Sequence, residues 1–494
     1  MKATYILLTT LLILIPAALF SQDGHADTSF SSDGIVKTDL SGGGSDFAFA
    51  LAQMQDGKIL AAGRLDGGSS GSFPAIVQYN ADGSLSLAFG GDGIVSRDVG
   101  SDFGVYTHVG AQADGKVIAA GPVGPFGSGI LLVNRYLPNG DLDTSFGNNG
   151  DLIPFNSANE SSAFVILDND SFLIANPVSD GSSTVIHLKK FLPDGTLDAS
   201  FGDNGTALVE NGNQSNTIYA MEVMANGNIV MAARIQTTGY QNSLARLLPD
   251  GSKDSSFGTN GIAIITEFTD YDLQSMAVYD DGRIALLQNS YDVPTETELN
   301  RITRYTADGV FDSTFGTGGQ GFIDPNKQFL GASTLLIQPD QRILLYGVLH
   351  DPLEGGGYTF IKRYHANGGT DSSFNLISIT EEGEYFSEKM LLQDDGKLVC
   401  MGFSAWYNGS EDFIVERYNN TPLGVPEFES GRLSAIVSEF FNSTEMSYQI
   451  NDTAGKVLMN GNLQSDHTEI DLSALQTGMY FLKAGNSTLR LVKE

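Results

Sequence analysis

The side chains of this chain whose type and regular spacing could do chemistry are those of its repeated aspartates. Six aspartates each stand three residues before a phenylalanine, and Ser86 takes that position once; the six are Asp27, Asp143, Asp198, Asp254, Asp312 and Asp371. A carboxylate or hydroxyl at this place can accept backbone N–H hydrogen bonds and cap a tight turn. A calcium loop is the alternative, although it needs several oxygen ligands at short spacing and each phrase supplies one regular carboxylate. We expect structural turn caps and no bound metal.

Motifs of catalysis are weak in this sequence. Residues 67–71, GGSSG, match the G-x-S-x-G pattern of a hydrolase nucleophile elbow, but that elbow needs a strand-to-helix turn and a Gly/Ser hairpin loop is expected here. The histidines show no spacing typical of zinc sites; they are His25, His108, His187, His350, His365 and His467. No phosphate-binding or dinucleotide-binding phrase occurs in a strand-to-helix context. We therefore predict no catalytic residues and no cofactor, and an enzyme stays an open alternative.

The aspartates belong to a longer phrase, DGxLDxSFGxxG, that recurs along the chain. Its aromatic residue gives spacings, by subtraction, of 59, 57, 55, 56, 58 and 59, because it falls at Phe30, Phe89, Phe146, Phe201, Phe257, Phe315 and Phe374. A period in this range indicates an array of supersecondary units. Each phenylalanine can anchor its turn between neighbouring units.

Each unit divides into four short β segments, joined by turns such as QMQDGK and by apolar runs such as KILAAG. Asp-Gly and Asn-Gly between apolar runs favour antiparallel hairpins, and no stretch keeps a helical period. Seven such units predict an all-β, seven-bladed β-propeller with four antiparallel strands per blade. A strand near Gly34 and a strand at 413–418 would close the ring. An open right-handed solenoid is the competing architecture.

The composition limits the partners. After removal of a leader that contains one lysine, 59 acidic residues face 26 basic ones, which leaves a formal charge of −33. This charge repels phosphate backbones, so no nucleic acid partner is expected. Cys400 is the single cysteine, which excludes an intrachain disulfide, and we expect it to be a small buried hydrophobe.

The first residues have the layout of a secretory signal peptide, which we assign to residues 1–21. Lys2 precedes an apolar run from Tyr5 to Phe20, and small and polar residues follow. A single membrane anchor is the alternative, although the run is short for a span. No later stretch is apolar enough to cross a bilayer, so we predict no transmembrane segment in the mature chain.

The alternation of QxDGKIlaaG with RYxxDGxLDxSFG resembles the delta-60 repeat, a family of extracellular bacterial propeller-like repeats. The resemblance covers about Asp27 to Asn420, and we assign residues 22–421 to the propeller. Three phrases depart from the pattern: LDNDSFLI, PDQR and SFNLISI. The family shares no enzymatic activity that the resemblance would imply.

Residues 422–494 have a different pattern, with alternating strands that predict a small antiparallel β-sandwich. They resemble the C-terminal sorting domain (type A) of the type IX secretion system, found in Bacteroidetes; the matching residues are Asp452, Gly455, Lys456, Leu472, Leu475, Gly478, Tyr480 and Phe481. The resemblance implies the type IX secretion machinery as a partner and the outer-membrane surface or the extracellular space as the location. An ordinary Ig-like module is the alternative.

Strand order predicts two different faces. In antiparallel blades the DGK and LDxSFG turns share one face, and the loops of variable length share the other. Recognition usually resides in variable loops, and flat aromatic side chains beside carboxylates suit a sugar or a peptide; the candidates are Trp406, Tyr407, Tyr240, Tyr291 and Tyr358. We predict a non-enzymatic binding module for a glycan or protein ligand. The alternatives are rings that only pack loop bases, a secreted polysaccharide lyase or hydrolase, and a structural surface spacer.

Overall fold

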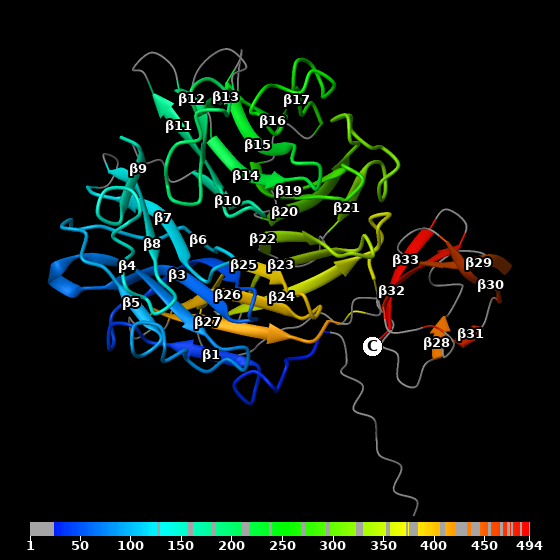
Figure 1. Cartoon of the computed structure of the whole chain (residues 1–494), viewed down its shortest axis with the longest axis horizontal. Coiled ribbons are helices and arrows are strands. Elements are labelled where there is room, and N and C mark those ends of the chain that lie inside the picture. The colour runs from blue at the N-terminus through cyan, green and yellow to red at the C-terminus, as the bar shows by residue number, and fades with distance from the viewer. Residues whose placement is uncertain are drawn as a thin grey trace, which may run out of the picture.

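A computed structural model gives the fold of the chain (Figure 1). The residues that it describes are 24–125, 129–156, 162–179, 184–209, 217–236, 240–267, 272–292, 297–322, 330–351, 356–371, 374, 384–405, 411–420, 432–435, 445–452, 456–464, 468–471, 475, 478–484 and 487–493. The predicted signal peptide lies outside them. Among these residues no helix is long and apolar enough to span a membrane.

Four-stranded antiparallel sheets form the first blades, and each runs from an inner to an outer strand in chain order. Blade 1 contains β2 (Phe47–Gln53), β3 (Ile59–Asp66), β4 (Ser72–Tyr79) and β5 (Ile94–Ser96). Blade 2 contains β6 (His108–Ala111), β7 (Val117–Val123), β8 (Ile130–Tyr136) and β9 (Asp151–Phe155). Blade 3 contains β10 (Ala163–Ile166), β11 (Phe172–Ser179), β12 (Thr184–Phe191) and β13 (Thr206–Val209). Blade 4 contains β14 (Thr217–Val223), β15 (Ile229–Gln236), β16 (Tyr240–Leu247) and β17 (Ile262–Ile264).

The remaining blades complete the predicted count of seven. Blade 5 contains β18 (Asp272–Val278), β19 (Ile284–Asp292), β20 (Thr297–Tyr305) and β21 (Gln320–Phe322). Blade 6 has three described strands, β22 (Leu330–Ile337), β23 (Ile343–Asp351) and β24 (Gly356–Tyr364). Blade 7 joins both ends of the array, because β25 (Glu384–Leu392), β26 (Leu398–Ala405) and β27 (Glu411–Tyr418) pair with β1 (Ile35–Thr38). The first strand of each sequence unit is therefore the outer strand of the preceding blade.

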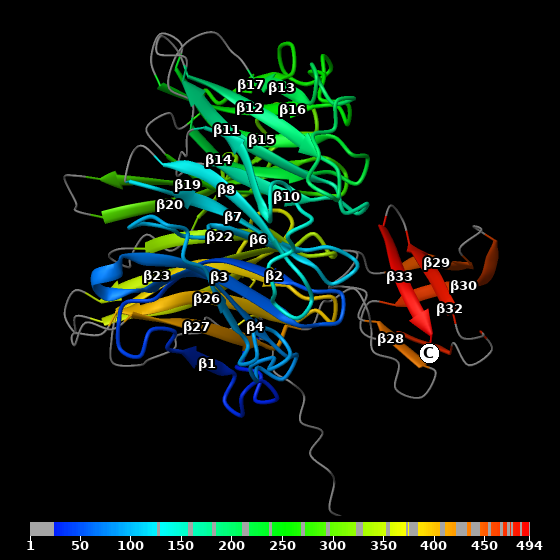
Figure 2. The ribbon, with the colours of Figure 1, turned by 60° about the vertical axis from the view of Figure 1, so that its left-hand side comes forward.

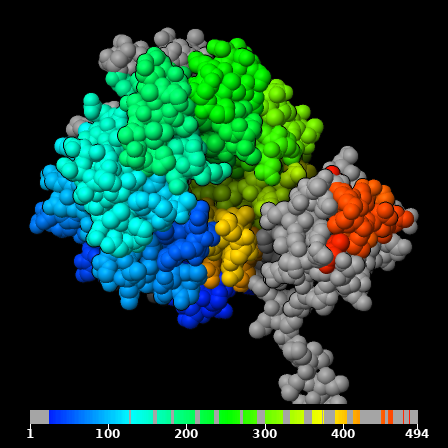
Figure 3. Space-filling model, viewed as in Figure 1, coloured from blue at the N-terminus to red at the C-terminus, as the bar shows by residue number. Residues whose placement is uncertain are grey.

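The inner strands form a closed ring, which excludes the open solenoid. Contacts run from β2 to β6, β10, β14, β18, β22 and β25 and back to β2. In Figure 1 the labelled inner strands, β6, β10, β14, β22 and β25, lie around the middle of the ring, and Figure 2 gives a second view of the blades. In Figure 3 the blades follow one another around it in the order of their colours. The core lies between blades; for example, Ile59 and Val77 of blade 1 pack with Val399 and Val415 of blade 7.

The turns that depart from the repeat keep its backbone shape. Asp170 takes the place of the usual glycine in LDND, and Gln341 takes it in PDQR. Both residues have positive φ angles, 66° and 68°, the conformation that glycine adopts most readily. Residues 375–383, which include all of the irregular phrase SFNLISI after Phe374, lie outside the described part of the chain.

The C-terminal residues form two further antiparallel sheets, drawn in orange and red in Figure 1. One pairs β28 (Arg432–Ala435) with β31 (Thr468–Asp471). The other has the order β30 (Val457–Gln464), β29 (Glu445–Asp452), β32 (Gly478–Ala484) and β33 (Ser487–Lys493). A turn of 3₁₀ helix, η1 (Gly68–Ser70), is the helical element among the described residues.

Both ends of the array meet at a seam where β1 pairs with β27. Arg417 donates from Nε to Asp27 Oδ2 over 2.7 Å, and Lys397 Nζ lies 3.1 Å from the same oxygen. Burial raises the pKa of Asp27, but hydrogen bonds from Ser29 and the charges of Lys397 and Arg417 outweigh this effect and bring it to about 2. Asp27 is thus ionised at neutral pH and neutralises cations that the fold has partly buried.

Replacing Asp27 by Asn should destabilise the ring at neutral pH by about 3 kcal/mol, because Arg417 would keep its buried charge without its anion. The folded pKa lies below the ordinary value, so the aspartate stabilises the fold above pH ~4 and loses this effect as the pH falls towards 2. Urea unfolding of wild type and variant should therefore differ at pH 7 and converge near pH 2. The exposed Asp33→Asn is the control, and an equal loss in both variants would contradict the role of the seam.

Candidate functional site

The structure describes the backbone of three of the five aromatic residues predicted for the variable-loop face. Tyr240 begins β16, Tyr291 lies near the end of β19, and Tyr358 lies near the start of β24. Their backbones thus lie at the loop ends of three consecutive blades, whereas their side chains lie outside the described part of the chain. Trp406 and Tyr407 also lie outside it. A ligand site on this face remains a prediction.

On the opposite face, the repeated aspartates cap their turns. Asp143 Oδ1 accepts the backbone N–H of Ser145 at 3.0 Å and its hydroxyl at 2.5 Å. The same pair of bonds occurs at Asp27, Asp198, Asp254 and Asp312. One carboxylate oxygen of each is therefore occupied by the turn itself, which leaves the second oxygen for another partner.

The second oxygen binds a basic residue that sequence reasoning missed. Arg135 donates from Nε to Asp143 Oδ2 over 2.8 Å, from a position eight residues earlier in the chain. Equivalent arginines pair with Asp254, Asp312, Asp371 and Asp27; they are Arg246, Arg304, Arg363 and Arg417. The signal was present in the sequence, since the recurring Arg-Tyr of RYxxDGxLD stands at this fixed distance from the aspartate.

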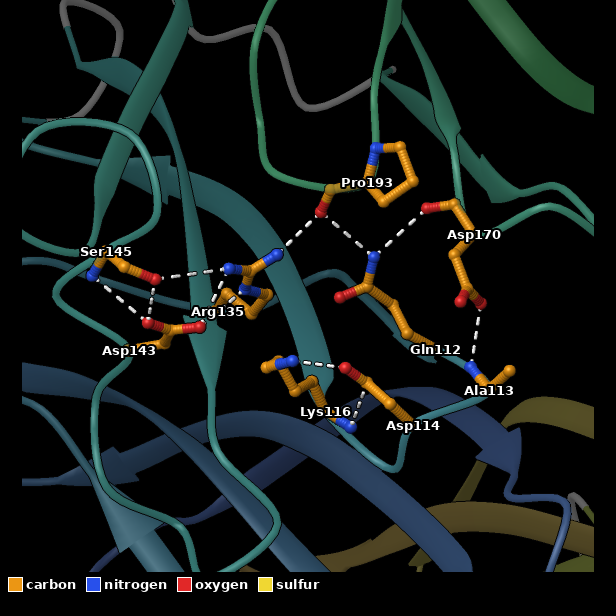
Figure 4. Close-up of polar contacts among 9 residues, drawn as sticks. All are labelled: Gln112, Ala113, Asp114, Lys116, Arg135, Asp143, Ser145, Asp170 and Pro193. Atoms are coloured by element: carbon orange, nitrogen blue, oxygen red, sulfur yellow. Dashed lines mark hydrogen bonds and ion pairs between the residues drawn. The ribbon is translucent and has the colours of Figure 1, made fainter.

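Each arginine also reaches the next blade, as Figure 4 shows for blades 2 and 3. Arg135 donates from Nη1 to the carbonyl oxygen of Pro193 over 2.6 Å, and its guanidinium lies 4.7 Å from the ring centre of Phe146. Gln112 donates to the same oxygen over 3.0 Å. We call the arginine, its aspartate and phenylalanine, and the carbonyl oxygen of the next blade the blade clamp.

The blade clamp recurs around the ring. Next-blade carbonyl oxygens accept from Arg246, Arg304 and Arg417, and Arg363 donates to the Asn420 side chain. In these four blades the guanidinium lies between 4.5 and 4.7 Å from the ring of its phenylalanine. A glycine of the next turn covers that ring, so a Cβ on Gly195 would come within 2.7 Å of Phe146. At five of the junctions, an arginine guanidinium group thus links the two neighbouring blades.

Two blades have no arginine at this position, and a cavity lies at each of their junctions. Lys190 replaces it in blade 3 and pairs with Asp198 at 3.3 Å; the cavity of about 380 Å³ beside it is lined by Phe201 and by Pro249 of blade 4. In blade 1 Gln78 and Ser86 replace both charged partners. A cavity of about 450 Å³ lies there between blades 1 and 2. The two cavities coincide with the two missing guanidinium groups.

Three carboxylates also gather near the seam. Asp39, Asp46 and Asp412 offer oxygen atoms within 4.8 Å of one another, a spacing that could hold a metal ion. Lys37 pairs with Asp412 at 3.0 Å, and Asp46 accepts backbone N–H groups of residues that include Leu40. Burial raises the pKa of Asp46. One ammonium group and backbone N–H donors thus offset part of the charge of the three carboxylates.

The structure describes the surroundings of three residues considered from the sequence, Ser69, His108 and Cys400. Gly68–Ser70 form η1 between two strands of blade 1, so Ser69 does not sit on a strand-to-helix elbow. His108 Nε2 lies 3.1 Å from the Ser162 hydroxyl. Burial, and to a smaller extent the charge of Lys389, lower its pKa to about 4. Cys400 is buried, as expected for a small hydrophobe.

Residues of the predicted sorting motif lie on neighbouring strands. Asp452 at the end of β29 faces Tyr480 of β32, and Asn451 faces Phe481. Gly478 begins β32. Lys456 directly precedes β30, Leu475 lies between β31 and β32, and Gly455 and Leu472 lie outside the described residues.

Replacing Lys190 by Arg should close the cavity between blades 3 and 4. The guanidinium can donate to Pro249 and lie over Phe201, which should stabilise the propeller by about 1 kcal/mol. Arg246→Lys is the matched control, because it should open a cavity at the next junction and cost a similar amount. Denaturant unfolding measures both. Equal stability of all three proteins would contradict the role given to the arginine.

Two family models match the sequence. One, described as a domain of unknown function (DUF5122) beta-propeller, matches residues 55–89, 112–146, 175–201, 225–257 and 393–421. The other, the secretion system C-terminal sorting domain, matches residues 434–494. A comparison with curated proteins gave no match.

Solved structures of similar shape are remote in sequence. The polysaccharide lyase Uly1 is 11% identical at a TM-score of 0.49, with 78% of this chain and 99% of the lyase covered. The β-propeller domain of the Trilobed protease from Pyrococcus furiosus is 10% identical at 0.43, with coverages of 77% and 98%. PorZ, a surface component of the type IX secretion system of Porphyromonas gingivalis, is 11% identical at 0.32, with coverages of 91% and 74%. At these scores the similarities carry no functional argument. The family models match DUF5122 β-propeller repeats and a secretion sorting domain, and the chain is therefore a β-propeller with a C-terminal sorting domain of the type IX secretion system.

Proposed function

We propose that this protein is a non-enzymatic binding module that its sorting domain delivers to the cell surface or the extracellular space. The observation that carries the proposal is the combination of a closed ring with a sorting tail. In the proposal the leader, residues 1–21, directs passage across the inner membrane, and the tail directs passage across the outer membrane.

In the structure, the contacts that hold the blades together lie on a different face from the loops proposed to bind a ligand. The blade clamps and the turn caps all lie at one end of the strands, where they hold neighbouring blades together. The described residues at the other end of the strands make none of these contacts, so the loops there can vary in length and composition without loss of a clamp. Binding residues are often found on such loops above a rigid scaffold. We propose a glycan or peptide ligand that contacts Trp406, Tyr407, Tyr240, Tyr291 and Tyr358.

Deletion of residues 434–494 should trap the protein in the periplasm. Cell fractionation and surface labelling of full-length and truncated protein measure this effect. Because the propeller buries its core between its own blades, the truncated protein should keep the thermal melt of the ring. Unchanged surface display after the deletion would overturn the sorting role. Loss of the thermal unfolding transition in the truncated protein would mean that the tail is needed for the propeller to fold.

A screen of the purified protein against glycans and peptides, with product analysis, tests the binding role. Substitution of Trp406 and Tyr407 by Ala should weaken binding of a hit at least tenfold, because each removes a flat apolar contact worth about 1 kcal/mol or more. Leu192→Ala is the control, since Leu192 is 41% exposed on the opposite face. Unchanged affinity in the double variant, or cleavage of the ligand, would contradict the proposal.

A further inference from the structure

The junction between blades 1 and 2 lacks the donors that close the next junction. In blades 2 and 3, the Pro193 oxygen accepts one bond from Arg135 and one from Gln112. The corresponding residues of blade 1 are Gln78 and Met54. Gln78 donates instead to Met54 Sδ, at 3.3 Å. The carbonyl of Pro138, which corresponds to Pro193, therefore receives neither of these side-chain bonds.

The cavity at this junction presents hydrogen-bond acceptors. Its lining includes Pro138 and Gln112 from blade 2. The amide of Gln112 lies on the other side of blade 2, where it donates to Asp170 and Pro193 of blade 3. Carboxylates of Asp56 and Asp114 stand in the same lining, where they pair with Lys58 and Lys116 of their own turns.

We propose that this cavity binds a guanidinium group, presented as the arginine side chain of a partner peptide. The other junctions provide the template, because five of them hold an arginine of the protein itself between the aromatic residue and the next turn. A guanidinium has five N–H donors and no acceptor, which matches the Pro138 carbonyl and the carboxylates of Asp56 and Asp114 in this lining. The strongly negative chain attracts such a cation.

The second cavity is the internal comparison. There Lys190 keeps its ammonium group 3.3 Å from Asp198, so a guanidinium that entered would meet a positive charge beside the carboxylate. In the first cavity Gln78 and Ser86 bring no charge to this position, and the ammonium group of Lys58 is paired with Asp56 in the turn. We therefore assign the arginine site to the junction of blades 1 and 2 alone. The site lies on the turn face, opposite the variable loops, so its test is independent of the binding role proposed for those loops.

Calorimetric titration of the full-length mature protein with Nα-acetyl-arginine amide tests the site. We expect a saturable complex with a dissociation constant of about 1 mM, as befits a fragment of this size. The citrulline analogue has the same shape but no charge, and it should bind at least tenfold more weakly. Gln78→Arg combined with Ser86→Asp rebuilds the blade clamp in the protein itself, so it should abolish binding and raise the unfolding midpoint. Lys190→Arg fills the other cavity and should leave binding unchanged.

Several results would overturn the proposal. One is the absence of binding to wild type at 10 mM or more, well above the expected constant of about 1 mM. Equal binding of arginine and citrulline would show that charge is not recognised. Binding that survives the Gln78→Arg and Ser86→Asp double variant, with its unfolding midpoint raised, would place the ligand elsewhere. Loss of binding in Lys190→Arg would move the site to the junction of blades 3 and 4.

Discussion

The guanidinium group of the repeated arginine is the contact on which the ring depends. A single cation binds the capped aspartate, lies on the buried phenylalanine of its own blade, and donates to the turn of the next blade. Buried ion pairs are weak evidence of net stability, since desolvation offsets much of their attraction. Their effect here is geometric, because three partners in two blades fix the spacing and the angle of neighbouring sheets. Lysine reaches only the first partner at Lys190.

Local chemistry made most of the fold predictable from the sequence. The period of the phenylalanines, with Asp-Gly and Asn-Gly turns between apolar runs, specified seven blades and the seam between β1 and β27. The arginine was missed because its aspartate lies eight residues away, across a hairpin whose register has to be known first. The cavities were missed for a related reason. The cavities lie where Gln78 and Lys190 lack the guanidinium group of the other blades. The absence of a group produces no sequence motif that could be searched for.

The candidate binding face was harder to predict than the scaffold. Turn residues are constrained by positive φ angles and by clamps, and so they repeat. No such constraint acts on loop residues such as Tyr240, Tyr291 and Tyr358. The sequence therefore predicts the face on which they lie but not how they are arranged there. The same asymmetry explains how a propeller keeps one architecture while its loops differ from blade to blade.

The seam has a consequence for the order of events during synthesis. Asp27 and Arg417 are separated by 390 residues, which makes this contact about as non-local as the propeller allows. Contacts of such separation form late, because the entropy of closing the intervening loop is lost before any bond compensates it. At roughly 5–20 residues per second a ribosome needs about 20–75 s to travel from β1 to β27. Until β27 is available β1 lacks its partner strand, so any blades that form earlier leave two sheet edges free to pair with other chains.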